Sequence, residues 1–110
     1  MSYQHADLAG GRWKTFTFLE QMANIASEVE RALNWRAKNN PAYAQRALER
    51  ALELLDLTLI EPGSASRLRE LTTVREALVD FFTGNNVSAS TDALWRKYFA
   101  PFTYAARRTH

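Results

Sequence analysis

The sequence predicts an all-α protein, folded as an up-and-down antiparallel four-helix bundle. Apolar residues recur at the three- and four-residue spacing of a helix in four segments, and no stretch alternates as a half-buried strand does. Four Gly and three Pro are few for 110 residues, and the connections between the segments are short, which favours antiparallel neighbours. A chain of this length supports one core. We therefore expect residues 1–110 to form a single domain, with 1–14 as a flexible N-terminal arm and 109–110 as a tail.

The first predicted helix begins after Thr17. Thr17 and Glu20 have the spacing of a capping box, in which each side chain accepts a hydrogen bond from a backbone N–H at the helix start. The helix ends in KNNP, residues 38–41. Its apolar stripe comprises Phe18, Met22, Ile25, Val29, Ala32 and Leu33.

Asn40 and Pro41 open the second predicted helix, over residues 41–60. Asn is a favourable N-cap, and Pro at the first helical position loses no hydrogen bond that the helix needs. The segment EPGS, residues 61–64, ends this helix. Its main stripe comprises Ala44, Leu48, Ala51, Leu52, Leu55 and Leu59.

The third predicted helix begins at Ser64 or Ser66 and ends at Gly84. Glycine is favoured there because a residue after a helix often adopts a left-handed conformation. The apolar stripe comprises Leu68, Leu71, Val74, Leu78, Phe81 and Phe82.

Arg75 lies inside the apolar stripe of this third helix. A buried guanidinium needs a carboxylate or carbonyl partner, and Glu30, Glu53 and Asp56 border the stripes of the first two helices. We therefore expect a buried ion pair at Arg75 rather than a site for an external anion.

The fourth predicted helix follows Ser90 or Thr91 and contains LWRKYFAPFTYAARR, residues 94–108. Its larger apolar side chains fall within an arc of roughly 140° at helical spacing, which predicts that they are core. Pro101 removes one helical hydrogen bond and clashes with the preceding turn, so we expect a kink or break there. The predicted core members are Leu94, Trp95, Tyr98, Phe99 and Phe102.

The cations Arg96, Lys97, Arg107 and Arg108 lie outside that arc, and Asp92 is the single acid of residues 85–110. A surface that stacks nucleic-acid bases needs its rings on the same exposed side as its cations. Among the five aromatic residues of this segment, Tyr104 alone meets that condition. Nucleic-acid association through the four cations and Tyr104 is therefore an alternative hypothesis rather than the leading one.

Trp35, Leu57 and Ile60 lie off the main stripes of the first and second helices, as Tyr104 does in the fourth. For Trp35, burial beneath a neighbouring loop is an equally good interpretation. Aromatic residues are enriched in protein interfaces, and most oligomers are symmetric homo-oligomers. These four residues are our interface candidates, and they lead to the principal hypothesis: a non-enzymatic bundle acting through protein–protein contact, as a homodimer.

The sequence lacks the residues that several kinds of catalytic or metal site require. The chain has no cysteine, and its two histidines, His5 and His110, lie in the predicted terminal segments. A di-metal carboxylate bundle needs inward Glu-x-x-His pairs, and serine–histidine catalysis needs a positioned histidine. Arg107 and Arg108 are too close to His110 for the Arg-to-His spacing of HEPN-type ribonucleases. We expect no cofactor.

Glu53 and Asp56 are three residues apart. This pair resembles one acidic motif of the all-α MazG-type pyrophosphohydrolases, and that resemblance implies magnesium held by carboxylates for nucleotide cleavage. Carboxylate oxygens are ligands that Mg²⁺ prefers. The companion acidic pair of the preceding helix is missing, because Glu28 and Glu30 are two residues apart and point to different faces. A magnesium-dependent hydrolase is therefore the third hypothesis.

Three stretches also resemble a group of small, uncharacterised prokaryotic helical proteins: NIASEVERALNW (24–35), RALELLDLT (50–58) and NNVSASTDALWRKYFAPFTYAAR (85–107). The resemblance implies a prokaryotic, soluble, helical protein and carries no activity. With no cysteine, no signal-peptide pattern and no apolar run of membrane-spanning length, we expect a cytoplasmic protein without a membrane partner.

Overall fold

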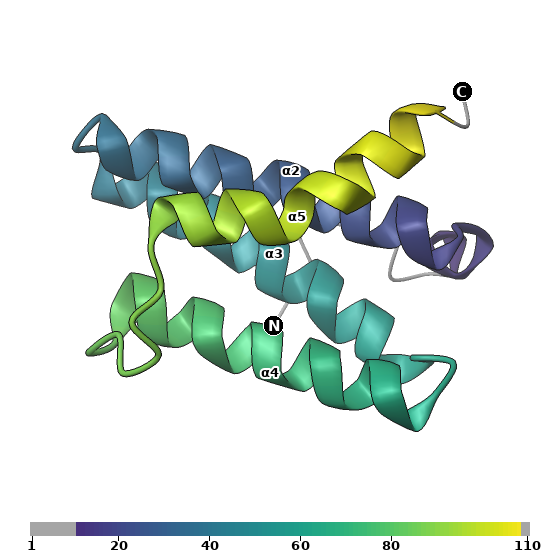
Figure 1. The fold of residues 1–110 in the computed structure, drawn as a ribbon. Coiled ribbons are helices and arrows are strands. Elements are labelled where there is room, and N and C mark those ends of the chain that lie inside the picture. Colours follow the sequence, from purple (N-terminus) through teal and green to yellow (C-terminus); the bar gives the residue numbers. More distant parts are fainter. Residues whose placement is uncertain (1–10, 109–110) are drawn as a thin grey trace.

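The computed structural model describes residues 11–108 as a bundle of antiparallel helices (Figure 1). A short 3-10 helix, η1 (Arg12–Thr15), precedes four α-helices, which are α2 (Phe18–Ala37), α3 (Pro41–Ile60), α4 (Ala65–Thr83) and α5 (Asp92–Arg108). Each α-helix reverses the direction of the one before it, and α5 returns along α2. The prediction of an all-α, up-and-down four-helix bundle is confirmed. The predicted tail, 109–110, lies outside the described residues.

The predicted N-terminal caps are present. Thr17 Oγ1 accepts a hydrogen bond from the Glu20 backbone N–H at 3.1 Å, and Glu20 Oε1 accepts one from the Thr17 N–H at 2.8 Å. Asn40 caps α3 with Pro41 at its start. Of the alternatives left open by the sequence, Ser64 caps α4 and Thr91 caps α5. Local side-chain chemistry therefore sets where each helix begins.

Asn39 ends α2 in a left-handed conformation, with φ 58°. The Asn40 N–H donates to the Trp35 carbonyl at 3.0 Å, and the Asn39 N–H donates to the Arg36 carbonyl at 3.0 Å. These two bonds form a Schellman motif, which satisfies carbonyls that the helix end leaves free. The turn that results is tight, and it sets α3 antiparallel to α2.

Gly84 differs from its prediction. Its φ of −108° is not left-handed. A Cβ at this position would lie 3.0 Å from the Asp80 carbonyl oxygen, to which the Gly84 N–H also donates. Glycine is favoured here because a side chain would crowd the backbone of Asp80.

The expected N-terminal arm over 1–14 is wrong for its last residues, and its first ten lie outside the described range. Trp13 in η1 is 2 % exposed and belongs to the hydrophobic core. Its indole N–H donates to Thr58 Oγ1 in α3 at 2.9 Å. The segment that precedes α2 is thus part of the packed domain.

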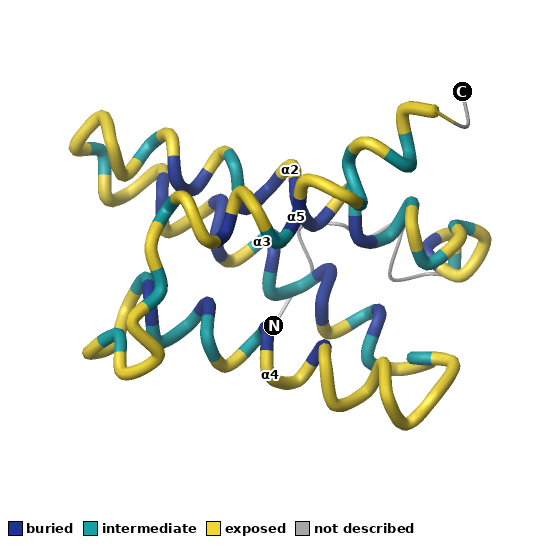
Figure 2. The backbone as a smooth tube through the Cα atoms, viewed as in Figure 1, coloured by how far each residue is buried: buried dark blue, intermediate teal, exposed yellow. Residues whose placement is uncertain are grey.

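Helix α2 packs against both α3 and α5, whereas α4 packs mainly against α3. Figure 2 shows that the buried backbone concentrates where α2, α3 and α5 meet, while the first turns of α4 are largely exposed. Helices α4 and α5 touch through side chains, including Tyr98, whose hydroxyl donates to Glu70 Oε2 at 3.0 Å. The bundle is therefore less closed between α4 and α5 than elsewhere.

This packing corrects two predicted core positions. Leu94 is 54 % exposed and Leu68 is 44 % exposed, although both lie on the predicted stripes. Trp95 and Phe99 are buried as predicted, and Tyr98 and Phe102 are half-buried. Leu68 lies in the first turn of α4, and the weak contact between α4 and α5 leaves Leu94 uncovered.

Pro101 lies within α5, which continues to Arg108 without a break. Proline has no N–H, so the Lys97 carbonyl lacks its usual helical donor. Figure 1 shows α5 bending along its length, with its C-terminal half leaving the direction of its N-terminal half. Of the two outcomes expected at Pro101, the structure has a bent helix rather than a break. None of the helices in residues 11–108 combines the length and apolar composition that crossing a bilayer requires.

Candidate functional site

The four cations predicted for nucleic-acid contact have different surroundings: Arg96 and Arg107 line one groove, and Lys97 is exposed. Arg96 Nε donates to Glu30 Oε2 at 3.0 Å and its Nη2 donates to the same oxygen at 2.9 Å, so this guanidinium is bound to α2. The hydrogen bond to Glu30 raises the pKa of Arg96. Arg108 lies over the ring of Tyr104, 5.6 Å from its centroid. Because Tyr104 is the single ring exposed beside these cations in the described chain, no series of stacking rings is assembled there.

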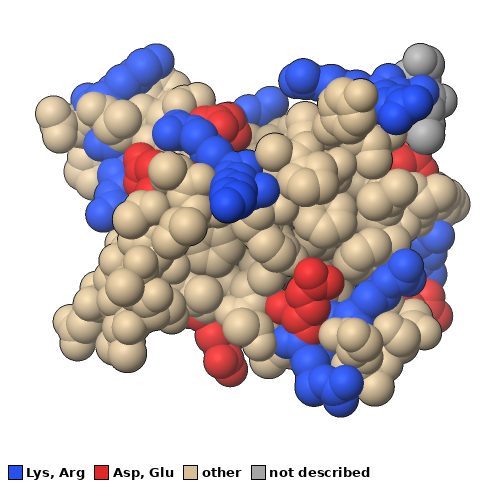
Figure 3. All heavy atoms as spheres, viewed as in Figure 1, with Lys and Arg blue, Asp and Glu red and all other residues tan. Residues whose placement is uncertain are grey.

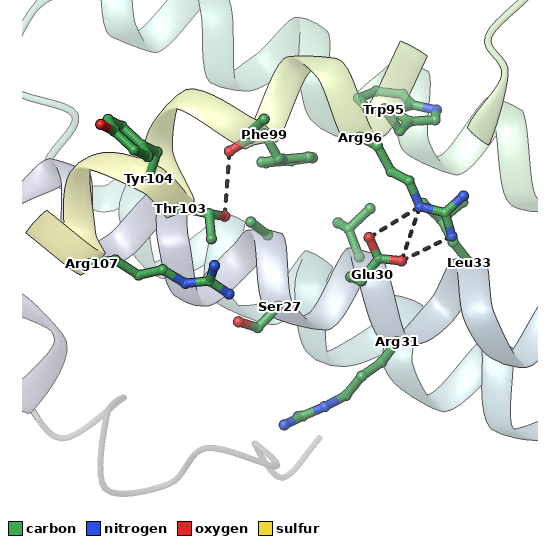
Figure 4. A pocket seen from close by; sticks show the side chains of 13 residues that line it. Ser27, Glu30, Arg31, Leu33, Trp95, Arg96, Phe99, Thr103, Tyr104 and Arg107 are labelled. Carbon is green, nitrogen blue, oxygen red and sulfur yellow. Dashed lines mark hydrogen bonds and ion pairs between the residues drawn. The ribbon is translucent and has the colours of Figure 1, made fainter. Parts of the chain in front are cut away.

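Helices α2 and α5 enclose a groove of about 610 Å³, which we call the α2–α5 groove. This volume is in the range typical of small-molecule pockets. Figure 4 shows Phe99, Thr103 and Arg107 of α5 and Glu30 of α2 directed toward the space between the two helices. Its apolar lining comprises Ala26, Val29, Leu33, Trp95, Phe99 and Ala100, and its polar lining comprises Ser27, Glu30, Arg31, Arg96, Thr103, Tyr104 and Arg107.

The arginines of the α2–α5 groove differ in their partners. Arg96 is bonded to Glu30, and Arg31 Nη1 is bonded to Glu28 Oε1 at 2.8 Å. Figure 4 shows the Arg31 side chain extending away from α5, while Arg107 reaches from α5 toward Ser27. No carboxylate of residues 11–108 is within ion-pair distance of Arg107. Within residues 11–108, the Arg107 end of the groove therefore carries a positive charge without a carboxylate partner.

A second surface lies between α4 and α5, and we call it the α4–α5 seam. It contains a shallow notch of about 270 Å³, lined by Thr73, Val74, Ala77, Ser90, Leu94, Trp95 and Tyr98. None of these side chains carries a charge at neutral pH. Figure 3 shows a band of uncharged residues across the middle of one face, with charged side chains both above and below it. The seam is thus an apolar surface that the monomer leaves partly open.

Two polar groups of the seam have unusual surroundings. Trp95 is 7 % exposed, and its indole N–H has no hydrogen-bond partner in the described structure. Figure 4 shows this nitrogen on the side of the ring away from Phe99. Burial, and then the hydrogen bond to Glu70, raise the pKa of Tyr98. The Tyr98 phenol therefore stays protonated and remains a donor across the seam.

The structure does not bring the predicted interface candidates together. Trp35 is half-buried against Tyr43, with ring centroids 4.8 Å apart, and it lies at the C-terminal end of α2. Leu57 is half-buried against the core. Ile60 is 65 % exposed at the C-terminal end of α3, and Tyr104 is 63 % exposed near the end of α5. Since α2 and α3 are antiparallel, Trp35 and Ile60 lie at opposite ends of the bundle.

Glu28 is a buried charge that the sequence pattern did not single out. It is 6 % exposed, with Arg31 bonded to Oε1 at 2.8 Å and Arg50 Nε bonded to Oε2 at 2.9 Å. By phase it belongs to the polar side of α2. It is buried because α2 packs against two helices, which widens the arc that is removed from solvent. Its two arginine partners compensate the buried charge.

Arg75 forms the predicted ion pair, but the pair is not buried. Its Nε donates to Asp56 Oδ1 at 2.7 Å and its Nη2 donates to Oδ2 at 3.2 Å. The side chains are 36 % and 49 % exposed. The hydrogen bond to Asp56 raises the pKa of Arg75. The pair connects α3 to α4 at the surface because the edge of the α4 stripe remains open to solvent.

The predicted acidic motif contributes to this same contact. Asp56 is bonded to Arg75, and so its carboxylate is already paired with a cation. Within residues 11–108, Glu53 and Asp56 belong to no group of three or more His, Asp or Glu residues arranged to hold a metal ion. Asp56, one of the two acids of the motif, therefore has a structural role, which is to hold α4 against α3.

No protein-family model, curated protein or solved structure gives a significant match to this chain. The resemblance to small prokaryotic helical proteins stays a prediction. The α2–α5 groove and the α4–α5 seam are the features of the molecule that bear on its function.

Proposed function

We propose that this protein is a helical bundle that acts by protein–protein contact rather than by catalysis, and that it pairs with a second copy of itself through the α4–α5 seam. The observation that carries the proposal is the exposure of Leu94. This leucine lies on the apolar stripe of α5, yet it is 54 % exposed at the rim of the notch. Val87, in the connection just before α5, is 85 % exposed. Burying such side chains against a partner contributes roughly 25 cal/mol for each Å² of apolar surface.

The chemistry of the seam favours a second copy as the partner. In a two-fold dimer the same patch meets itself, so any charge at its centre would face an identical charge. The notch has no charged lining residue, so its centre meets an identical patch without like-charge repulsion.

The lengths of α4 and α5 indicate how much of the surface a dimer contact would use. A standard interface takes about 800 Å² from each partner. Helices α4 and α5 contain 19 and 17 residues, which at about 1.5 Å per residue makes them about 28 and 25 Å long. A standard interface would therefore need the exposed sides of both helices as well as the notch.

Light scattering at increasing protein concentration tests the proposal. We expect the wild-type chain to be a dimer at high micromolar concentration, and Leu94→Asp to be monomeric. Leu94 is exposed and lies in the first turn of α5, where an acidic residue suits the helix dipole, so this variant should fold normally. Circular dichroism checks that expectation.

The matched control is Ile60→Asp, which places the same charge on an exposed side chain at the end of α3. We expect this variant to remain dimeric. A wild-type protein that stays monomeric at high micromolar concentration would refute the dimer. Dissociation by Ile60→Asp while Leu94→Asp remains dimeric would place the contact at the end of α3 and overturn the seam.

A further inference from the structure

We infer that the α2–α5 groove binds a small organic anion in which a flat apolar body is joined to a phosphate, sulfonate or carboxylate group. This inference concerns a different surface from the proposed dimer contact, and either one can fail without the other. It rests on the volume of the groove, on its apolar wall and on the position of Arg107.

The apolar part of the groove suits a flat ring. Phe99 is 4 % exposed and Trp95 is 7 % exposed, and their rings stack with centroids 6.2 Å apart. Ala26 and Val29 supply the facing wall from α2. These buried side chains form an apolar floor, and the exposed Ala100 and Tyr104 stand at its edge, so a planar group could lie over the floor. Removing that group from water would stabilise the complex through the hydrophobic effect.

The charged part of the groove suits an anion. Arg96 is committed to Glu30 and Arg31 is committed to Glu28, whereas Arg107 has no carboxylate partner within residues 11–108. Figure 4 shows the Arg107 side chain directed across the groove toward Ser27. A guanidinium can donate two parallel hydrogen bonds to a carboxylate, sulfonate or phosphate. The anionic group would bind at Arg107, with the apolar body lying along Phe99.

Arg107 and Arg108 provide a matched pair for the test. They are consecutive arginines in the last turn of α5. Arg107 lines the groove, whereas Arg108 lies over the ring of Tyr104. Substituting either one by glutamine changes the net charge of the protein equally. If the ligand binds at Arg107, Arg107→Gln should weaken binding more than Arg108→Gln does. If only the net charge matters, the two substitutions should weaken binding equally.

The probe is naphthalene-2-sulfonate, followed by two-dimensional ¹H–¹⁵N NMR of the full chain. Its neutral analogue naphthalene-2-sulfonamide keeps the ring and removes the charge, and inorganic phosphate supplies an anion without a ring. We expect the sulfonate to shift the amide signals of residues 26–31 and 96–107. The sulfonamide and phosphate should each bind more weakly than the sulfonate.

Arg107→Gln should weaken sulfonate binding about tenfold, equivalent to about 1.4 kcal/mol. Arg108→Gln should change the dissociation constant by no more than about twofold, because an exposed charge outside the site is screened by salt. Equal effects of the two substitutions, or sulfonate binding no tighter than sulfonamide binding, would overturn the inference. Signal shifts confined to residues 73–95 would do the same, because the probe would then occupy the seam.

A variant that fills the groove gives a second test that does not remove an arginine. Ser27 is exposed on α2 and lines the groove, so Ser27→Phe should fold and occupy part of the space. We expect it to abolish sulfonate binding while its circular dichroism spectrum stays that of the wild type. Unchanged affinity in this folded variant would contradict a ligand lying in the groove.

Discussion

The indole N–H of Trp13 donates a hydrogen bond to Thr58 Oγ1 at 2.9 Å, and the Thr58 hydroxyl donates to the Leu54 carbonyl at 2.9 Å. Both side chains are 2 % exposed. This relay connects η1 to α3 across 45 residues of sequence. The N-terminal 3-10 turn is thereby fixed to the core by a specific polar contact as well as by burial of a large ring.

Thr58→Val should destabilise the fold by about 1–3 kcal/mol, because it leaves the buried Trp13 N–H without an acceptor. Chemical denaturation followed by circular dichroism measures this change. The matched control is Thr72→Val, since the Thr72 hydroxyl also donates to a carbonyl four residues earlier but is exposed. That control should change stability by less than about 0.5 kcal/mol. Equal effects at the two positions would show that the Trp13 contact contributes nothing.

Glu28→Ala should destabilise the protein by about 1–3 kcal/mol, because it removes the acceptor of two charged hydrogen bonds in a buried position. The exposure of Arg31 and Arg50, at 60 % and 27 %, limits the effect by letting solvent reach both cations. Glu49→Ala on the exposed face of α3 is the control, with an expected change below about 0.5 kcal/mol. Thermal unfolding measures the stability of both variants. An equal loss of stability in the two would mean that burial of Glu28 is unimportant.

The Arg75–Asp56 pair should contribute little despite its two short hydrogen bonds. Exposed ion pairs typically contribute about 0.2–1 kcal/mol, and salt weakens them. A double-mutant cycle with Arg75→Gln and Asp56→Asn measures the coupling directly. We expect a coupling energy in that range at low salt and a smaller one at high salt. A coupling energy well above it would mean that the pair is shielded from solvent in solution.

The raised pKa of Tyr98 predicts that the protein loses stability at high pH. Its pKa is raised in the folded protein above the ordinary value of 10.0, by burial first and then by Glu70. Its contribution is therefore complete below about pH 10 and falls as the pH rises further, because the unfolded chain releases the phenolic proton more readily. Tyr98→Phe should flatten this decline. Urea unfolding of both proteins between pH 8 and 11 provides the comparison, and identical slopes would exclude Tyr98 as the cause.

Local sequence signals predicted the helix starts well. Thr17, Asn40, Ser64 and Thr91 act within their own first turns, so their effect needs no knowledge of the rest of the fold. Gly84 was correctly predicted to end the third helix, but the reason differs: glycine is favoured by a close approach to Asp80. Local chemistry therefore accounts for where the helices begin.

Burial was predicted less well, because it depends on which helices meet. Trp13 precedes α2 and is buried by α3, a contact that no local pattern reveals. Glu28 has a polar phase but lies on a helix with two neighbours, and Leu94 has an apolar phase but lies where α4 leaves α5 uncovered. Of these three residues, Leu94 is the one that lines the seam. The groove depends on the spacing and bend of α5 relative to α2, and on the side-chain direction of Arg107, so helical phase alone did not predict it.

The proposal of a seam-to-seam dimer is tested most directly by a distance measured between two copies. Because the chain has no cysteine, Thr73→Cys provides a single attachment point for a spin label at the seam, and Glu49→Cys provides one on an exposed position of α3. Light scattering confirms first that each labelled protein keeps the wild-type mass. For Thr73 we predict one narrow intermolecular distance, shorter than the 35 Å long axis of the monomer and lost on dilution with unlabelled chains. Absence of a dipolar signal at Thr73, or a shorter distance at Glu49, would contradict the seam-to-seam dimer.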